Sequence, residues 1–152
     1  MKLEVTEMPG RRLAGIRRQG PYPRISEAFL RLFPQADALG LSRIAGAVYV
    51  AVYYDDPQAT SEDALRSFAA VTVAEDATIG DLEEARLPSG RYVRTAFFGP
   101  HSDLGEAWRH FNHQREEEGY QRRDGVSFEV YVGQENDALP DRDRTDLFAP
   151  VA

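Results

Sequence analysis

The sequence predicts an α+β fold in which two copies of one βαββ unit, of the SHS2 type, are related by a pseudo-two-fold axis. The expected architecture is an antiparallel sheet with one main helix per copy and a central cleft. Three observations predict it: an internal repeat at an offset of 79 residues, one amphipathic helix pattern in each copy, and runs of β-branched and aromatic residues.

The internal repeat is the strongest of these signals. An offset of 79 residues aligns Gly20-Pro21 with Gly99-Pro100 and Gly40 with Gly119, and it gives twelve identities without a gap. Glycine and proline punctuate structure, so their recurrence in the same order favours duplication over coincidence. We expect a single domain over residues 1–152, with repeat one at about 1–75, a linker at about 76–81 and repeat two at about 82–152.

The first half of each unit should be a strand, a turn and a helix. In copy one the strand is expected over Arg12–Arg18 and the turn at Gly20-Pro21. Gly40 is placed to end the helix, and Pro34 is expected to kink or split it. The apolar face of this helix comprises Ile25, Ala28, Phe29, Leu32 and Leu39.

Two strands should follow each helix. In copy one they are expected at 47–54 and near 68–73, with a turn at 55–57. Copy two repeats the pattern with a helix that carries Leu104, Ala107, Trp108 and Phe111 and ends at Gly119. Its strands are expected at 126–132 and near 146–151, with a polar turn at 134–137.

Composition and charge exclude several classes of function. The chain has no cysteine, which excludes disulfides, thiolate metal sites and a cysteine nucleophile. The net charge of -7 argues against direct nucleic-acid binding. No apolar run is long enough to span a bilayer and the start of the chain has no signal-peptide pattern, so we expect a cytoplasmic protein that makes no membrane contact.

Glu129 is the main candidate for chemistry. It lies in a strand where side chains alternate, so Phe128 and Val130 should pack on the helices while Glu129 and Tyr131 point away into the cleft. The repeat places Val50 opposite Glu129. A carboxylate in apolar surroundings is a candidate for binding a cation or moving a proton. The alternative is a glutamate that faces solvent or is neutralised by an arginine.

Aromatic residues supply the expected walls of the cleft. Tyr22 and His101 each follow a Gly-Pro turn that leads into a helix, although residues at such places often only cap a core. Tyr54, Phe68 and Trp108 add aromatic surface of the kind that binds flat or cationic compounds.

No metal site or cofactor is expected. His110 and His113 stand three residues apart with Glu106 one turn before, but no further ligand pattern accompanies them. We interpret them as a solvated helix face.

Several motifs together resemble the GyrI-like small-molecule-binding domains, which also serve as effector-binding domains of AraC-type and MerR-type regulators. They are the two Gly-Pro turns, the segment Tyr53–Pro57, the strand Phe128–Tyr131 and the ending Thr145–Val151. The resemblance implies a duplicated βαββ fold with a cleft between the halves and an acidic residue, matching Glu129, that contacts cationic lipophilic compounds. Relatives also include a gyrase-inhibitory protein and hydrolases of cyclopropane-bearing alkylating antibiotics.

Three segments depart from the family pattern. Arg66-Ser67-Phe68 replaces an Arg-Tyr-Asp, residues 114–118 replace a segment with Trp-Leu-Pro, and His101 replaces a tyrosine. Loss of that tryptophan weakens the hydrolase role, and loss of the aspartate argues against a second acid in the cleft.

We therefore expect a stand-alone protein that binds small aromatic or cationic lipophilic molecules, for sensing or sequestration. One alternative is a hydrolase of electrophilic, cyclopropane-bearing compounds that uses Glu129 and Tyr131. A second alternative is a protein-interaction role, with gyrase or a regulator as the partner. The sequence leaves the oligomeric state open.

Overall fold

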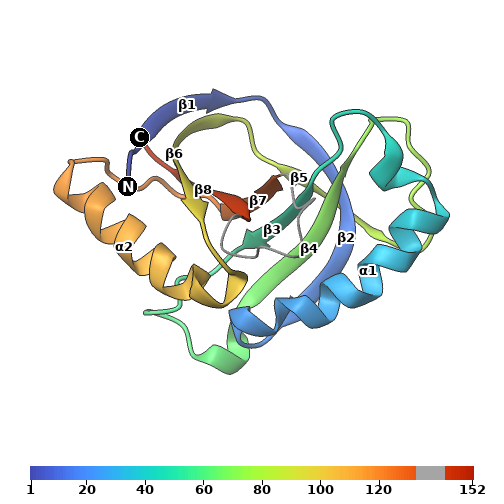
Figure 1. Cartoon of the computed structure of the whole chain (residues 1–152), viewed down its shortest axis with the longest axis horizontal. Helices are drawn as coiled ribbons and strands as arrows, with labels where there is room; N and C mark the ends of the chain where they lie inside the picture. The colour runs from blue at the N-terminus through green and yellow to red at the C-terminus, as the bar shows by residue number, and fades with distance from the viewer. Residues whose placement is uncertain (133–142) are drawn as a thin grey trace.

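The computed structural model describes residues 1–132 and 143–152, and this part of the chain forms one eight-stranded antiparallel sheet with two α-helices (Figure 1). The helices are α1 (Ser26–Ala38) and α2 (Leu104–Glu117). A short 3₁₀ turn precedes each of them, η1 (Tyr22–Ile25) and η4 (His101–Asp103), and two more are η2 (Leu41–Arg43) and η3 (Glu62–Ala64). The strands are β1 (Glu4–Met8), β2 (Arg11–Gln19), β3 (Tyr49–Tyr53), β4 (Arg66–Val73), β5 (Glu83–Leu87), β6 (Gly90–Phe98), β7 (Ser127–Val132) and β8 (Arg144–Pro150).

The strand order places β7 and β3 at the centre of the sheet. The order is β1-β6-β8-β7-β3-β4-β2-β5, so the two halves of the chain meet at the β7–β3 pair. In that pair Val50 lies opposite Val130, and Ala51 lies opposite Glu129. This register fixes which side chains share a face at the centre of the molecule.

The elements expected from the sequence are present within a few residues of their expected bounds. The structure also contains two short strands at the edges of the sheet, β1 and β5, which the sequence did not lead us to expect. The polar turn expected at 134–137 lies outside the described residues.

Helix α1 ends as expected but continues through Pro34. Gly40 has φ +71°, the left-handed conformation that commonly follows a helix end. Pro34 lacks the N–H that would bond to the carbonyl of Leu30, one turn earlier. Because the Leu30 side chain is 71% exposed, this stretch of helix faces water, which can bond to that carbonyl. The expected split is therefore wrong.

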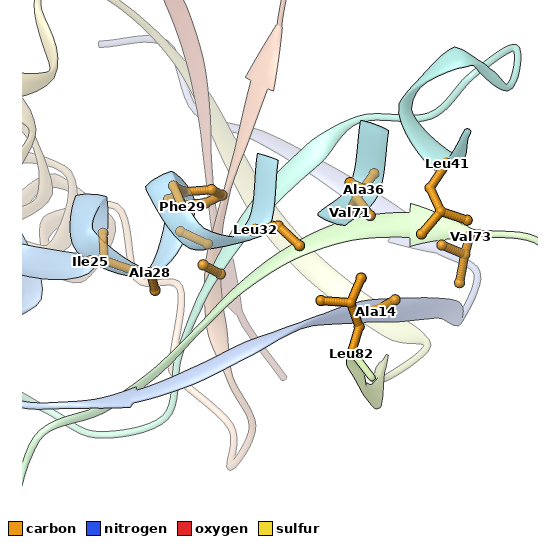
Figure 2. Packing of buried hydrophobic residues seen from close by; sticks show 12 residues of the cluster. Ala14, Ile25, Ala28, Phe29, Leu32, Ala36, Leu41, Val71, Val73 and Leu82 are labelled. Carbon is orange, nitrogen blue, oxygen red and sulfur yellow. The ribbon is translucent and has the colours of Figure 1, made fainter. Parts of the chain in front are cut away.

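Both helices cover the same face of the sheet. Figure 2 shows Phe29 and Leu32 on the side of α1 that faces the strands, in one buried cluster with Val71 of β4 and Ala14 of β2. Helix α2 packs in the same way on β6 and β8 through Phe111, which is fully buried. The central strands β3 and β7 lie between the two helices (Figure 1).

The other face of the sheet carries no helix and closes on itself. Leu13 and Leu87 from one end of the sheet belong to the same buried cluster as Tyr92 and Phe148 from the other end. This is possible because the sheet curls (Figure 1). The protein therefore has one core inside the curl and one under each helix.

No helix in residues 1–132 and 143–152 is both long and apolar enough to cross a membrane.

Candidate functional site

Glu129 lies at the centre of the sheet on the face that carries the helices. Its neighbours across the two adjacent strands are Ala51 of β3 and Leu147 of β8, both fully buried. Glu129 itself is 2% exposed. A carboxylate this deeply buried loses most of its hydration, so the groups around it determine whether it is charged.

Three neutral donors hydrogen-bond to the Glu129 carboxylate. The indole N–H of Trp108, on α2, donates to Oε1 at 2.8 Å. The hydroxyl of Tyr131, two residues along β7, donates to Oε2 at 2.9 Å. Tyr53, on β3, also hydrogen-bonds to the carboxylate. These bonds tie one helix and both central strands to a single side chain.

Burial dominates the ionisation of this cluster. It raises the pKa of Glu129, and the hydrogen bonds from Trp108, Tyr53 and Tyr131 oppose that rise only in part. The positive charge that His101 carries when protonated opposes it further. Burial and the nearby carboxylate also raise the pKa of both tyrosines well above the usual range, so they remain hydrogen-bond donors at neutral pH.

Aromatic rings from both halves of the chain surround the carboxylate. The ring of Tyr53 contacts Tyr22 at a centroid distance of 4.5 Å and Trp108 at 6.2 Å. The ring of Tyr131 contacts His101 at 5.1 Å and Phe29 of α1 at 5.5 Å. The site is therefore a negatively ionisable group enclosed by aromatic side chains between the two helices.

Tyr22 is fixed by the loop after β3. Its hydroxyl donates to the carbonyl of Asp55 at 2.8 Å and accepts the N–H of Asp55 at 2.9 Å. Burial raises the pKa of Tyr22 to about 12. The Tyr22 ring is thus held against Tyr53, which in turn hydrogen-bonds to Glu129.

The structure brings together five of the eight residues expected from the sequence: Glu129, Tyr131, Trp108, Tyr22 and His101. Val50, Phe68 and Tyr54 belong to the core on the other face of the sheet. Their expected place beside Glu129 is wrong.

The reason is an inverted assignment of faces. The alternation in β7 is as expected, but Glu129 and Tyr131 point toward the helices, while Phe128 and Val130 point into the curl. The alternation of side chains along a strand shows which residues share a face, but it does not show which of the two faces the helices cover. Both groups are largely buried here, so hydrophobicity could not distinguish them.

Sequence reasoning missed Tyr53 and Phe29 as members of the site. Tyr53 shares a face with Ala51, the residue that lies opposite Glu129, and this relation depends on the β3–β7 register. Phe29 was expected only as a core residue of α1. For Tyr53, the one available signal in the sequence was its position two residues after Ala51, which places the two side chains on the same face of the strand.

The described residues contain no group of three or more histidine, cysteine, aspartate or glutamate side chains arranged to hold a metal ion. His113, which was weighed as a ligand, instead lies 2.8 Å from Glu117 on the exposed side of α2.

Comparisons with known proteins identify the family and the fold. A family model described as the GyrI-like small molecule binding domain matches residues 1–152. A protein of Serratia proteamaculans named DNA gyrase inhibitor is 31% identical over 142 residues, which cover 87% of each chain.

Two solved structures share the fold. One is the protein SAV2435 bound to tetraphenylphosphonium, with a TM-score of 0.76, 16% identity, and coverage of 100% of this chain and 94% of that chain. The other is the C-terminal domain of EcmrR, with a TM-score of 0.75, 18% identity, and coverage of 99% and 97%.

Proposed function

The chain belongs to the GyrI-like family of small-molecule-binding domains, and from that premise we propose that it binds lipophilic cations at Glu129. One observation carries the proposal. Glu129 is a carboxylate that is 2% exposed, accepts hydrogen bonds from Trp108, Tyr53 and Tyr131, and has no lysine or arginine among the described residues as an ion-pair partner.

Electrostatics favours a cationic ligand over a neutral one. An ionised carboxylate buried without a counter-ion is costly, which is why burial raises the pKa of Glu129. A bound cation supplies the counter-charge that no lysine or arginine of the described residues provides. The faces of Tyr53, Tyr131 and Trp108 add cation–π attraction, which is strongest in a site that excludes water.

The ligand has to displace part of the aromatic enclosure. The site is closed by the contacts among Trp108, Tyr53 and Tyr131, so access to Glu129 requires the Trp108 indole or the Tyr131 ring to move. Large aromatic cations suit this arrangement because they replace the ring contacts that they break. Binding of tetraphenylphosphonium by SAV2435, which shares the fold, supports this ligand class.

The duplication expected from the sequence belongs to the same proposal. Exchanging β1 with β5, β2 with β6, β3 with β7 and β4 with β8 turns the strand order into its own reverse, and α1 exchanges with α2. A pseudo-two-fold axis through the Ala51–Glu129 pair would account for this. It would also relate Tyr53 to Tyr131, so that the two tyrosines flank the carboxylate from opposite sides.

Calorimetric titration tests the proposed function. Glu129→Gln keeps the shape of the side chain and removes its charge, so affinity for tetraphenylphosphonium should fall about ten- to a hundredfold, or about 1.5 to 3 kcal/mol. Affinity for the neutral triphenylphosphine oxide should change little. The matched control is Glu106→Gln, which removes an exposed charge from α2 and should leave both affinities unchanged.

The proposal fails if Glu129→Gln weakens the cation and the neutral compound equally, or weakens neither. The same variant separates binding from hydrolysis, because an enzyme that uses Glu129 would lose turnover while retaining much of its substrate affinity.

The names of the curated relatives favour inhibition of DNA gyrase as a second candidate function. A supercoiling assay with purified gyrase tests it directly. Dose-dependent inhibition by the wild-type chain would support this function, and unchanged supercoiling at an excess of the chain would exclude it.

A further inference from the structure

A second hollow in the protein lies away from Glu129, at the ends of β2 and β4. It is a cavity of about 320 Å³ lined by Arg17, Arg18, Gln19, Tyr54, Arg66 and Ser67. Three of these six residues are arginines in a chain whose net charge is -7. Tyr54, which the sequence suggested as a wall of the Glu129 site, belongs to this cavity instead.

Strand alternation shows which side chains the cavity presents. Arg17 follows Leu13 at even spacing along β2, and Arg66 precedes Phe68 on β4 by two residues, so both arginines share the face that carries no helix. Arg18 alternates with them and projects to the helix side, where its guanidinium donates to the carbonyl of Pro21. The two cations at the cavity are therefore Arg17 and Arg66.

Both of these guanidiniums lie against aromatic rings. Arg17 lies over the ring of Phe68 at 5.4 Å, and Arg66 lies over the ring of Tyr54 at 5.9 Å. The cavity thus combines positive charge with the half-buried ring of Tyr54, while Phe68 lies fully buried beneath Arg17. Stacked guanidiniums keep their N–H edges directed outward, where they can bind an anion.

The present partners of the two arginines are exchangeable. Arg17 pairs with Glu83 at 2.6 Å, and Arg66 binds the Asp55 carboxylate with two N–H groups at 2.8 and 3.1 Å. The arginine side chains are 57% and 64% exposed. Exposed ion pairs contribute little net stability, so a carboxylate from a ligand can compete with them.

The fold itself does not require the arginine at position 17. In the other half of the sheet, the pair Phe98–Arg144 of β6 and β8 corresponds to the pair Gln19–Arg66 of β2 and β4. Ala96 of β6 therefore takes the place that Arg17 has on β2. Phe98 is 62% exposed. The other half of the sheet folds with alanine in the place of Arg17, so Arg17 is not needed to stabilise the sheet, whereas Arg66 has a counterpart there in Arg144.

We propose that this cavity binds a small organic anion, a carboxylate attached to an aromatic ring, with Arg17 and Arg66 holding the carboxylate and Tyr54 contacting the ring. Arginine presents a fork of donors that matches a carboxylate, as the contacts with Asp55 already illustrate. The volume of about 320 Å³ lies within the range of small-molecule sites and accommodates one ring. The site is independent of Glu129, which lies on the opposite face of the sheet.

An NMR titration with benzoate, benzamide and inorganic phosphate tests the proposal on the full chain. Benzoate should shift the amide signals of residues 17–19, 54 and 66 with saturation, and benzamide, which lacks the charge, should not. The double variant Arg17→Gln, Arg66→Gln should bind benzoate at least about tenfold more weakly. Phosphate should bind more weakly than benzoate because it makes no contact with the ring wall.

The matched control is Arg86→Gln, which removes an arginine of similar exposure from its ion pair with Glu75, outside the cavity. It should leave benzoate binding unchanged. The proposal is overturned if benzoate shifts no signals at these positions, if the double variant binds it as well as the wild type, or if Arg86→Gln weakens binding equally. Phosphate binding as tight as benzoate binding would also overturn it. A folded spectrum of the double variant excludes unfolding as the cause of any loss.

Discussion

At the scale of single residues, Glu129 is the feature that links the fold to the proposed cation binding. It is the one carboxylate that the central strands hold beneath Trp108, and its donors Tyr53 and Tyr131 come from both halves of the sheet. The alternation of β7 was enough to group Glu129 with Tyr131 from the sequence. The sequence could not show on which face of the sheet Glu129 lies or how β7 is paired with β3, because both depend on how the curled sheet meets the helices.

The raised pKa of Glu129 should make the proposed cation binding depend on pH. Burial favours the protonated form of the carboxyl, whereas a bound cation favours the ionised form. Affinity for tetraphenylphosphonium should therefore increase as the pH rises through the raised pKa and then level off. Titrations at about pH 5 and about pH 8 test this.

Two comparisons control the pH experiment. Triphenylphosphine oxide, which is neutral, should bind equally at both pH values, and Glu129→Gln should bind the cation with little pH dependence. The contribution of Glu129 to the stability of the ligand-free protein changes with pH in the direction opposite to the cation affinity. The folded state retains the Glu129 proton more tightly than the unfolded state, so this contribution is present at low pH and is lost as the pH rises through the folded pKa. A cation affinity that falls with rising pH would contradict the account.

At the scale of elements, the sequence predicted the central strands and both helices better than the edges of the sheet. β3, β4 and β7 carry β-branched or aromatic runs bounded by turns, β2 is a short apolar and basic run that ends at a Gly-Pro turn, and Gly40 and Gly119 follow the helix ends. The edge strands β1 and β5 are short and rich in charged residues, which is how edge strands avoid pairing with other molecules. Because of this composition, a search of the sequence for buried strands does not find them.

The close approach of β2 to β4 at Gly15 gives an element-scale prediction. A Cβ at this position would lie 2.0 Å from the carbonyl oxygen of Ala69, a backbone atom that cannot move independently. Gly15→Ala should therefore destabilise the protein by about 2 to 4 kcal/mol, measured by urea denaturation.

Gly105→Ala is the matched control for that substitution. Gly105 lies in the first turn of α2, and no atom lies within 4 Å of an added Cβ. Alanine should leave stability unchanged or raise it by up to about 1 kcal/mol. Equal stabilities for the two variants would show that β2 and β4 are not packed as closely as described.

At the scale of the whole molecule, the two halves share one sheet and one core. The β3–β7 pair joins them at the centre of the sheet, and the core inside the curl takes residues from both ends, such as Leu13 and Tyr92. The repeat at 79 residues led us to expect two related units, and this relation stays a prediction. At the centre of the sheet, Glu129 lies opposite Ala51 and on the other face from Val50, so under the proposed two-fold axis the repeat offset would be one residue shorter in β7.

Separated halves should not fold. Chains of residues 1–75 and 82–152 would each expose β3 or β7 as an open edge and would divide the core inside the curl. We expect each fragment to show no cooperative thermal transition by circular dichroism, whereas the full chain shows one. A cooperative transition in either fragment alone would refute the single-unit description.

The most direct test of cation binding at Glu129 uses Trp108, which is the single tryptophan of the chain and donates to that carboxylate. Tetraphenylphosphonium should produce a saturable change in Trp108 fluorescence in the wild-type protein and in Glu106→Gln. In Glu129→Gln the midpoint of the titration should shift to about ten- to a hundredfold higher concentration. Absence of a saturable change in the wild type, or the same midpoint in Glu129→Gln, would contradict the central claim.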